Sequence, residues 1–335
     1  MATDARASAC WSPQRPDQRR DTPHAMPHAM PFLDPFTTAT GAQRATVALA
    51  GLETLWINTG TLCNLACKTC YIESSPTNDA LAYPTLHEVS PYLREAKRRG
   101  AAKIGFTGGE PFLNPDAIPM IEESLSLGFS VLVLTNAMRP MMRPAVRQGL
   151  SRLQAAHGRR LVLRVSLDGY CAEVHDAERG AGSFAAALDG IAWLAGRGFR
   201  LAIAGRLLSG EDEPAMRMGF AELFAREGID LDASSPSDLV IFPQMSEGTP
   251  TPEITEACWD LLGKSPNDVM CASSRMVVKR KGADRPSVLA CTLISRDMAF
   301  DLGADLDAAC NAIVPLNHPY CSRFCVLGGA SCSGA

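Results

Sequence analysis

Short apolar runs alternate with longer amphipathic segments through most of this 335-residue chain. Six of the runs are typical of strands, at residues 54–60, 102–108, 130–136, 160–169, 200–208 and 238–244. The segments between them have helical patterns and end in glycine, as helix C-termini often do, at residues 86–100, 115–128, 143–158, 183–198 and 213–228. Strands that alternate with helices usually pair in parallel. The pattern predicts an α/β fold, either an open doubly wound sheet or a barrel.

The sequence outside this alternating region has a different character at each end. Residues 1–45 are rich in Pro, Ala, Arg and Thr without helical or strand periodicity, which predicts a poorly structured extension. Its chemistry-bearing side chains are then bystanders, namely Cys10, His24 and His28. Residues 46–250 form the predicted main domain. Residues 251–335 begin with one more helical pattern and continue with a predicted hairpin around "KGADRP" and a cysteine-rich end.

Composition limits the partners and the compartment. The 32 basic and 36 acidic residues are mixed along the chain, with no like-charge run long enough to follow a phosphate backbone, so no nucleic-acid partner is expected. No apolar stretch is long enough for a bilayer, and the N-terminus lacks the apolar run of a signal peptide. We therefore expect a cytoplasmic protein without a membrane partner. In that compartment, 12 cysteines indicate metal binding or catalysis rather than disulfides.

Three cysteines lie close together in "TLCNLACKTCYIE", residues 61–73: Cys63, Cys67 and Cys70. Three thiolates in one loop can hold three irons of a four-iron cluster and leave the fourth iron open to a substrate. Structural zinc is the alternative, but it normally takes four ligands as two separated pairs. The nearest histidine, His87, lies in the following helical segment. The spacing favours the open cluster and leaves zinc as the alternative.

Polar residues also follow the other predicted strands. "TGGEP" at 107–111 follows the second strand, Asn136 the third, "SLDG" with Ser166 and Asp168 the fourth, and Arg206 the fifth. In a parallel barrel such residues meet at one rim, where barrel enzymes place their chemistry. Each could instead serve a turn, a helix terminus or a surface ion pair. Their convergence with the cysteine loop favours a site.

The motif Cys63-x3-Cys67-x2-Cys70 after the first strand, with Gly108-Gly109-Glu110 after the second, resembles the radical S-adenosylmethionine (SAM) superfamily. The resemblance covers roughly residues 52–246 and implies a partial (βα)6 barrel. It also implies a 4Fe-4S cluster held by the three cysteines, with SAM chelated to the open iron. Reduction of such a cluster, by a donor such as flavodoxin or ferredoxin, cleaves SAM to a 5′-deoxyadenosyl radical.

The resemblance further implies how SAM is held. The two glycines would let the backbone approach SAM, and Glu110 would accept its ammonium group. Ser166 and Asp168 stand where the family contacts the ribose, and Arg206 could pair with the methionine carboxylate. Asn136 is a further pocket candidate. The family often has an aromatic residue before the third cysteine; here that position is Thr69, and Tyr71 follows instead.

The C-terminal cysteines resemble the auxiliary-cluster extensions of this superfamily, the SPASM and shorter twitch domains. The ligands that we expect for one auxiliary 4Fe-4S cluster are Cys291, Cys321, Cys325 and Cys332, with Cys310 as the first replacement and Cys271 as a sixth candidate. A closed four-thiolate zinc site is the alternative. His318 is expected to be a loop residue, and Cys171 and Cys258 ordinary cysteines.

Extensions of this kind occur in peptide maturases, sulfatase-activating enzymes and small-molecule dehydrogenases. We expect hydrogen-atom abstraction from a peptide or protein substrate. A small-molecule substrate is the alternative, because residues 1–45 show no pattern of a leader-binding domain. A non-catalytic metal-binding or electron-transfer protein is the alternative of a different class, although closed sites would have no use for polar residues at the strand ends.

Overall fold

The structure, a computed structural model, describes residues 30–208, 212–243 and 250–328. Cys10, His24, His28 and Cys332 lie outside these residues. The main sheet has eight strands in the order β7-β6-β5-β4-β3-β2-β8-β9. The strands are β2 (Thr54–Asn58), β3 (Lys103–Thr107), β4 (Ser130–Thr135), β5 (Leu161–Ser166), β6 (Arg200–Arg206), β7 (Leu239–Phe242), β8 (Ser274–Val278) and β9 (Ser287–Leu289).

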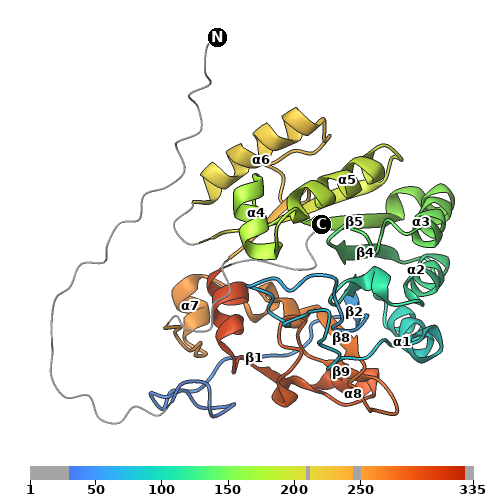
Figure 1. The fold of residues 1–335 in the computed structure, drawn as a ribbon. Coiled ribbons are helices and arrows are strands. Elements are labelled where there is room, and N and C mark those ends of the chain that lie inside the picture. Colours follow the sequence, from blue (N-terminus) through green and yellow to red (C-terminus); the bar gives the residue numbers. More distant parts are fainter. Residues whose placement is uncertain (1–29, 209–211, 244–249, 329–335) are drawn as a thin grey trace.

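Helices cover the outer face of this sheet (Figure 1). They are α1 (Leu86–Arg98), α2 (Ala117–Ser126), α3 (Pro144–His157), α4 (Ala172–Arg179), α5 (Ser183–Ala195) and α6 (Glu213–Glu227). Local sequence sets their starts: Thr85 and Glu88 form a capping box at α1, and Asp212 accepts a hydrogen bond from the Ala215 amide at α6. None of the described helices is long and apolar enough to cross a membrane.

Every pair from β2 to β7 is parallel. The registers run in step, for example Asn58 opposite Thr107 and Ser166 opposite Ala204. The carboxyl ends of these strands therefore share one rim of the curved sheet. All six predicted strands are present in the predicted order, and the prediction of an α/β fold with a parallel, partial-barrel sheet is confirmed.

The two faces of the sheet pack separately. Leu55, Ile57 and Phe106 point outward into the core shared with the helices, whereas Trp56 and Met276 belong to a second apolar cluster with the C-terminal region. Gly105 leaves room for the indole of Trp56, because a Cβ at that glycine would come within 2.3 Å of the ring. The inner cluster thus joins the barrel to the C-terminal region.

The C-terminal region holds several short elements. They are α7 (Cys258–Leu262), α8 (Leu306–Asn311), a π-helix at Cys321–Leu327, and short 3₁₀ turns at Pro266–Asp268, Met270–Ala272 and Met298–Phe300. The predicted hairpin exists as antiparallel β8 and β9. However, β8 also pairs in parallel with β2, so the hairpin continues the barrel sheet rather than forming part of a separate unit. The helical pattern near residue 250 is shorter than predicted, since α7 spans only five residues.

The N-terminal residues from 30 onward differ from the prediction of a poorly structured extension. A short strand β1 (Thr46–Val47) pairs with β10 (Val314–Pro315), and the side chain of Arg44 is fully buried. The Arg44 guanidinium forms an ion pair with Glu253 and donates to the Asp34 and Thr37 carbonyls. A periodicity search does not detect this segment, because an ion pair between distant residues holds it in place.

Removing the charge of Glu253 should destabilise the fold. Glu253→Gln is expected to lower the free energy of unfolding by about 3 kcal/mol, because a buried Arg44 would lose its ionic partner. Burial raises the pKa of Glu253, but hydrogen bonds from the Ala39 and Phe32 amides and from Arg44 outweigh it and lower the pKa overall. The ionised Glu253 carboxylate therefore stabilises the fold fully above the ordinary pKa of a glutamate. This stabilisation is lost as pH falls through the lowered pKa of Glu253.

Urea denaturation at neutral pH and at about pH 3 checks this expectation. Glu222→Gln, on the exposed face of α6, is the matched control and should change stability by less than about 0.5 kcal/mol. Equal stability of the two variants at neutral pH would show that Arg44 and Glu253 do not anchor residues 30–47.

Candidate functional site

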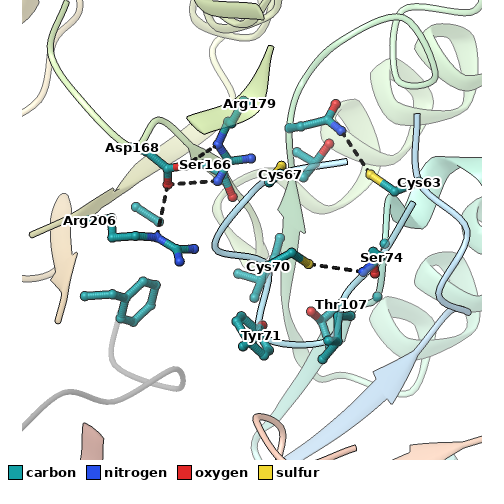
Figure 2. A pocket seen from close by; sticks show the side chains of 18 of the residues that line it. Cys63, Cys67, Cys70, Tyr71, Ser74, Thr107, Ser166, Asp168, Arg179 and Arg206 are labelled. Atoms are coloured by element: carbon teal, nitrogen blue, oxygen red, sulfur yellow. Dashed lines mark hydrogen bonds and ion pairs between the residues drawn. The ribbon is translucent and has the colours of Figure 1, made fainter. Parts of the chain in front are cut away.

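A pocket opens at the carboxyl rim of the sheet, and all three cysteines of the 61–73 loop line it (Figure 2). The strand ends supply the opposite walls. Of the residues predicted from sequence, the pocket is lined by Cys63, Cys67, Cys70, Tyr71, Gly108, Gly109, Asn136, Ser166, Asp168 and Arg206. Glu110 is the exception, because it lies behind this lining. The structure thus brings the predicted residues to one place.

The cysteine loop aims hydrogen-bond donors at its own sulfur atoms. The Leu65 amide lies 3.4 Å from the Cys63 sulfur, and the Ser74 amide lies 3.3 Å from the Cys70 sulfur. The Asn136 side-chain amide lies 3.9 Å from the Cys63 sulfur. N–H groups directed at sulfur stabilise thiolates and tune iron–sulfur clusters. This donor set therefore fits thiolate ligands of a cluster.

Without a metal, these thiols hold their protons firmly. Burial raises the pKa of Cys63 to about 12, and burial also raises the pKa of Cys67. Negative charges on Cys67 and Cys70 would raise the pKa of Cys63 further, so ionisation of the three thiols is favoured by a cation among them. Metal ligation supplies that cation and removes the protons.

Gly108 and Gly109 tie the second strand end to the cysteine loop. Gly108 has φ 146°, a value that favours glycine, and a Cβ on Gly109 would lie 2.2 Å from the Leu62 carbonyl oxygen. The Gly109 amide donates to the Gly60 carbonyl at 2.8 Å. The two glycines therefore allow the cysteine loop to pack directly on the end of β3, and both also line the pocket.

Glu110 connects β3 to the end of β4. Its carboxylate accepts hydrogen bonds from the Thr135 hydroxyl at 2.9 Å, the Asn136 amide at 2.9 Å and the Phe112 amide at 3.2 Å. Burial raises the pKa of Glu110 to about 7, although these hydrogen bonds oppose the shift. The side chain is 1% exposed. Glu110 thus holds Thr135 and Asn136, both of which line the pocket, in position.

A buried ion-pair network forms the far wall (Figure 2). Asp168 accepts two hydrogen bonds from Arg179, at 2.7 and 2.9 Å, and lies 3.5 Å from the Arg206 guanidinium. Burial raises the pKa of Asp168, but the two arginines outweigh burial and lower the pKa overall. Most of the carboxylate's hydrogen-bonding capacity is therefore taken by Arg179.

Sequence reasoning did not single out Arg179. It is the last residue of α4, in "HDAERG". Its side chain lines the pocket and donates hydrogen bonds to the Asp168 carboxylate. His175 in the same helix accepts a hydrogen bond from the Asp168 amide, and burial lowers its pKa to about 4, so it is a neutral acceptor at pH 7. The sequence signal for these two residues is their spacing: His175 and Arg179 are four positions apart in the helix that follows "SLDG", so they lie on one face of it.

The cysteine loop is braced against the same helix. The Lys68 amide donates to the Glu178 carbonyl at 3.0 Å, and the Thr69 hydroxyl donates to the Glu178 carboxylate at 3.0 Å. Arg206 donates to the Thr69 carbonyl at 2.5 Å. Thr69, the residue that departs from the family pattern, thus has a structural role in fixing the loop. Tyr71, on the other side of Cys70, faces the pocket.

A second group of cysteines lies in the C-terminal region. Cys271, Cys291, Cys321 and Cys325 line one small cavity that is otherwise apolar. Cys321 and Cys325 are four residues apart on one face of the π-helix, and Cys291 follows β9. Burial raises the pKa of Cys271 to about 12 and the pKa of Cys321 well above its ordinary value. As in the first group, ligation would remove these protons.

This set differs from the predicted one in one member. Cys332 lies outside the described residues, and Cys271, the sixth candidate, lines the cavity with the three other predicted ligands. Cys310, the first replacement, lies in α8 within the outer core, near Arg99 and Arg275, and does not line the cavity. His318 is a loop residue whose ring packs on Tyr320. Cys171 and Cys258 line neither cavity.

The described thiols form no compact site for a single metal ion. Within the described ranges, no three His, Cys, Asp or Glu side chains approach closely enough to hold one metal ion. A four-iron cluster does not need such an approach, because each thiolate binds a different iron.

Comparison with known proteins gives the family. Residues 57–217 match the Radical SAM superfamily. Among curated proteins, the chain is 34% identical over 137 residues to "Mycofactocin maturase MftC" of Mycobacterium ulcerans, covering 41% of this chain and 35% of that protein. It is 32% identical over 143 residues to "Antilisterial bacteriocin subtilosin biosynthesis protein AlbA" of Bacillus subtilis, covering 42% of this chain and 30% of that protein. The chain thus matches about a third of the length of these relatives.

Solved structures show the same fold. Streptococcus suis SuiB bound to S-adenosylmethionine superposes with a TM-score of 0.57 at 13% identity, covering 77% of this chain and 64% of that one. The structure of anSMEcpe with bound AdoMet and the Kp18Cys peptide superposes with a TM-score of 0.52 at 16% identity, covering 75% of this chain and 77% of that one. With their Cys-x3-Cys-x2-Cys loop at the carboxyl rim of a parallel sheet, residues 57–217 of this chain form a radical SAM domain.

Proposed function

We propose that this chain is a radical SAM enzyme that modifies a peptide. A 4Fe-4S cluster with SAM on its open iron supplies, once reduced, a 5′-deoxyadenosyl radical that removes a hydrogen atom from the substrate. The protein binds both cofactor parts, orients the substrate and excludes water. The observation that carries the proposal is the pocket in which three cysteine thiols face polar residues from four strand ends.

Each wall of the pocket has a proposed task. Cys63, Cys67 and Cys70 ligate the cluster, with the Leu65 and Ser74 amides donating to sulfur. Ser166 is placed to contact a ribose hydroxyl, and Arg206 to pair with the methionine carboxylate, since both line the pocket. Because the carboxylate of Asp168 already holds Arg179, we propose that Asp168 acts mainly by positioning the two arginines.

Glu110 has a proposed dual role. Its carboxylate already holds the end of β4 through Thr135 and Asn136, and the Gly-Gly-Glu motif places it where the family receives the SAM ammonium group. A carboxylate with a pKa of about 7 is half protonated at neutral pH. Ammonium binding beside it would favour the ionised form.

Two observations support a peptide substrate. MftC is named as a maturase and AlbA as a bacteriocin biosynthesis protein, and anSMEcpe was solved with a peptide bound. The second is a polar cavity between Tyr71 and Glu73 of the cysteine loop and residues 293–297, beside the rim pocket that Tyr71 also lines. A small molecule from an amino-acid or sugar pathway is the alternative substrate. The proposed electron donor is a flavodoxin or ferredoxin.

We further propose that Cys271, Cys291, Cys321 and Cys325 ligate one auxiliary 4Fe-4S cluster. All four line one buried cavity, and four thiolates complete a closed cluster. Cys332 is replaced by Cys271 in this set. A closed site of this kind has no open iron, so its proposed role is electron transfer or substrate binding.

The first prediction concerns SAM cleavage. Anaerobically reconstituted protein with dithionite and SAM should form 5′-deoxyadenosine, measured by liquid chromatography. The triple variant Cys63→Ala, Cys67→Ala, Cys70→Ala should lose this activity by at least about 100-fold, because no cluster would present an open iron. Cys171→Ala is the control and should retain it. Equal product from the triple variant and the wild type would support a non-catalytic metal-binding protein.

The second prediction concerns the pH dependence of SAM binding. Glu110 must be ionised to accept the ammonium group, so SAM affinity of the reconstituted protein should rise as pH increases through about 7. In Glu110→Gln that rise should disappear, and affinity above pH 7 should fall about tenfold, the loss of a charge-assisted hydrogen bond. Isothermal titration at about pH 6 and pH 8 measures both. Loss of cluster absorbance in Glu110→Gln would instead assign the residue to the cluster loop.

The third prediction concerns the auxiliary ligands. Reconstituted wild type should contain about eight irons per chain, as expected for two four-iron clusters. Cys271→Ala should lower the iron content toward four while 5′-deoxyadenosine formation persists. Cys310→Ala is the matched control, since Cys310 is equally buried but lies outside the cavity. An iron loss in Cys310→Ala but not in Cys271→Ala would return Cys310 to the ligand set.

A further inference from the structure

Arg275 is a fully buried arginine in the middle of the C-terminal region. It lies in β8, and its side chain is 0% exposed. The guanidinium donates to the carbonyls of Cys271 at 2.6 Å and Ala309 at 2.9 Å, with a longer contact to the Ala312 carbonyl at 3.5 Å. These hydrogen bonds satisfy its donors but bring no negative charge.

A buried cation normally has an anionic partner. Two other buried arginines in this chain have one, because Arg44 pairs with Glu253 and Arg179 pairs with Asp168. In the part of the chain that the structure describes, no carboxylate forms an ion pair with Arg275. Taking an unpaired charge out of water costs several kcal/mol. The fold therefore places a positive charge where an anion would stabilise it.

The groups near Arg275 that could carry negative charge are cysteines. The guanidinium donates to the carbonyl of Cys271 itself and to that of Ala309, the residue before Cys310. Only Cys271 faces the cavity of the second cysteine group. Among the described residues, the lining of that cavity contains no charged side chain. Four thiolates around an iron–sulfur core carry a net negative charge. A cluster ligated by Cys271 would therefore supply the anionic partner of Arg275.

We propose that Arg275 is the positioning residue and counter-charge of the auxiliary cluster. Its fork fixes the Cys271 backbone through the 2.6 Å hydrogen bond, and its positive charge compensates the cluster's negative charge in an apolar cavity. A nearby cation favours the reduced cluster, which carries one more electron. Arg275 therefore raises the reduction potential of this cluster. The inference rests on the proposed function, because it requires an auxiliary cluster at this cavity.

A second cation lies nearby but in a different setting. Lys264 donates to the carbonyl of Val326, beside Cys325, and is partly exposed to solvent. Solvent screens an exposed charge more strongly than a buried one. Lys264 is therefore expected to raise the reduction potential of the cluster less than Arg275 does. Its variant serves as an intermediate control.

The test is a potentiometric titration of the reconstituted holoprotein, followed by electron paramagnetic resonance. At the potential that half-reduces the wild-type auxiliary cluster, Arg275→Gln should lower the ratio of reduced to oxidised cluster about tenfold, or about 59 mV for one electron. Arg275→Lys, which keeps the charge without the fork, should stay close to wild type. Lys264→Met should shift the ratio less than Arg275→Gln. Arg160→Met, a distant arginine that also donates to main-chain carbonyls, should not shift it.

A second pair of variants covers the case in which Arg275→Gln does not fold. Cys310→Asp places a carboxylate next to Ala309, whose carbonyl accepts from the guanidinium, so it is expected to offset the charge of Arg275 without removing its hydrogen bonds. It should lower the ratio as Arg275→Gln does, whereas Cys310→Ser should not. Equal shifts in Arg275→Gln and Arg275→Lys, or equal potentials of Cys310→Asp and Cys310→Ser, would overturn the inference while leaving the proposed function intact. Iron content near four in the wild type would overturn the inference together with the proposed auxiliary cluster, whereas 5′-deoxyadenosine formation tests the proposed function separately.

Discussion

The parallel pairing of β2 to β7 is the constraint on which the site depends. It places six carboxyl strand ends on one rim, so residues more than a hundred positions apart in the chain meet in a single pocket. The cysteine loop packs on β3 through Gly109, on β4 through Asn136 and on α4 through Glu178. Each contact fixes the loop from a different strand–helix unit. The geometry of the three thiols is thus a property of the whole barrel rather than of the loop.

The two cysteine groups share one property, which is the burial of their thiols. In both, apolar surroundings raise thiol pKa values, and metal ligation relieves the resulting cost of forming thiolates. The difference lies in the surrounding charges. The rim pocket contains Asp168 with Arg179 and Arg206, a network with one more positive than negative charge, which suits a cosubstrate that carries a carboxylate. The C-terminal cavity has an apolar lining with one buried guanidinium behind Cys271, which suits a closed cluster.

Local patterns predicted much of this arrangement. Strand and helix periodicity yielded the six barrel strands, and the cysteine spacing with "TGGEP" yielded most of the pocket lining. The missed features depend on contacts between distant residues. The parallel pairing of β8 with β2 joins positions 54 and 274, and the Arg44–Glu253 pair orders a segment without periodicity. Cys271 lines the C-terminal cavity and Cys310 does not, and no spacing rule in the sequence reports that difference.

Electron paramagnetic resonance of the reduced, reconstituted protein with and without SAM tests the central claim most directly. The account predicts two cluster signals, of which SAM alters one. That signal should be missing from the variant lacking Cys63, Cys67 and Cys70, while the second signal remains and does not respond to SAM. A spectrum that SAM leaves unchanged in the wild type, or a SAM-dependent change that persists in the triple variant, would contradict the assignment of the rim pocket as the SAM site.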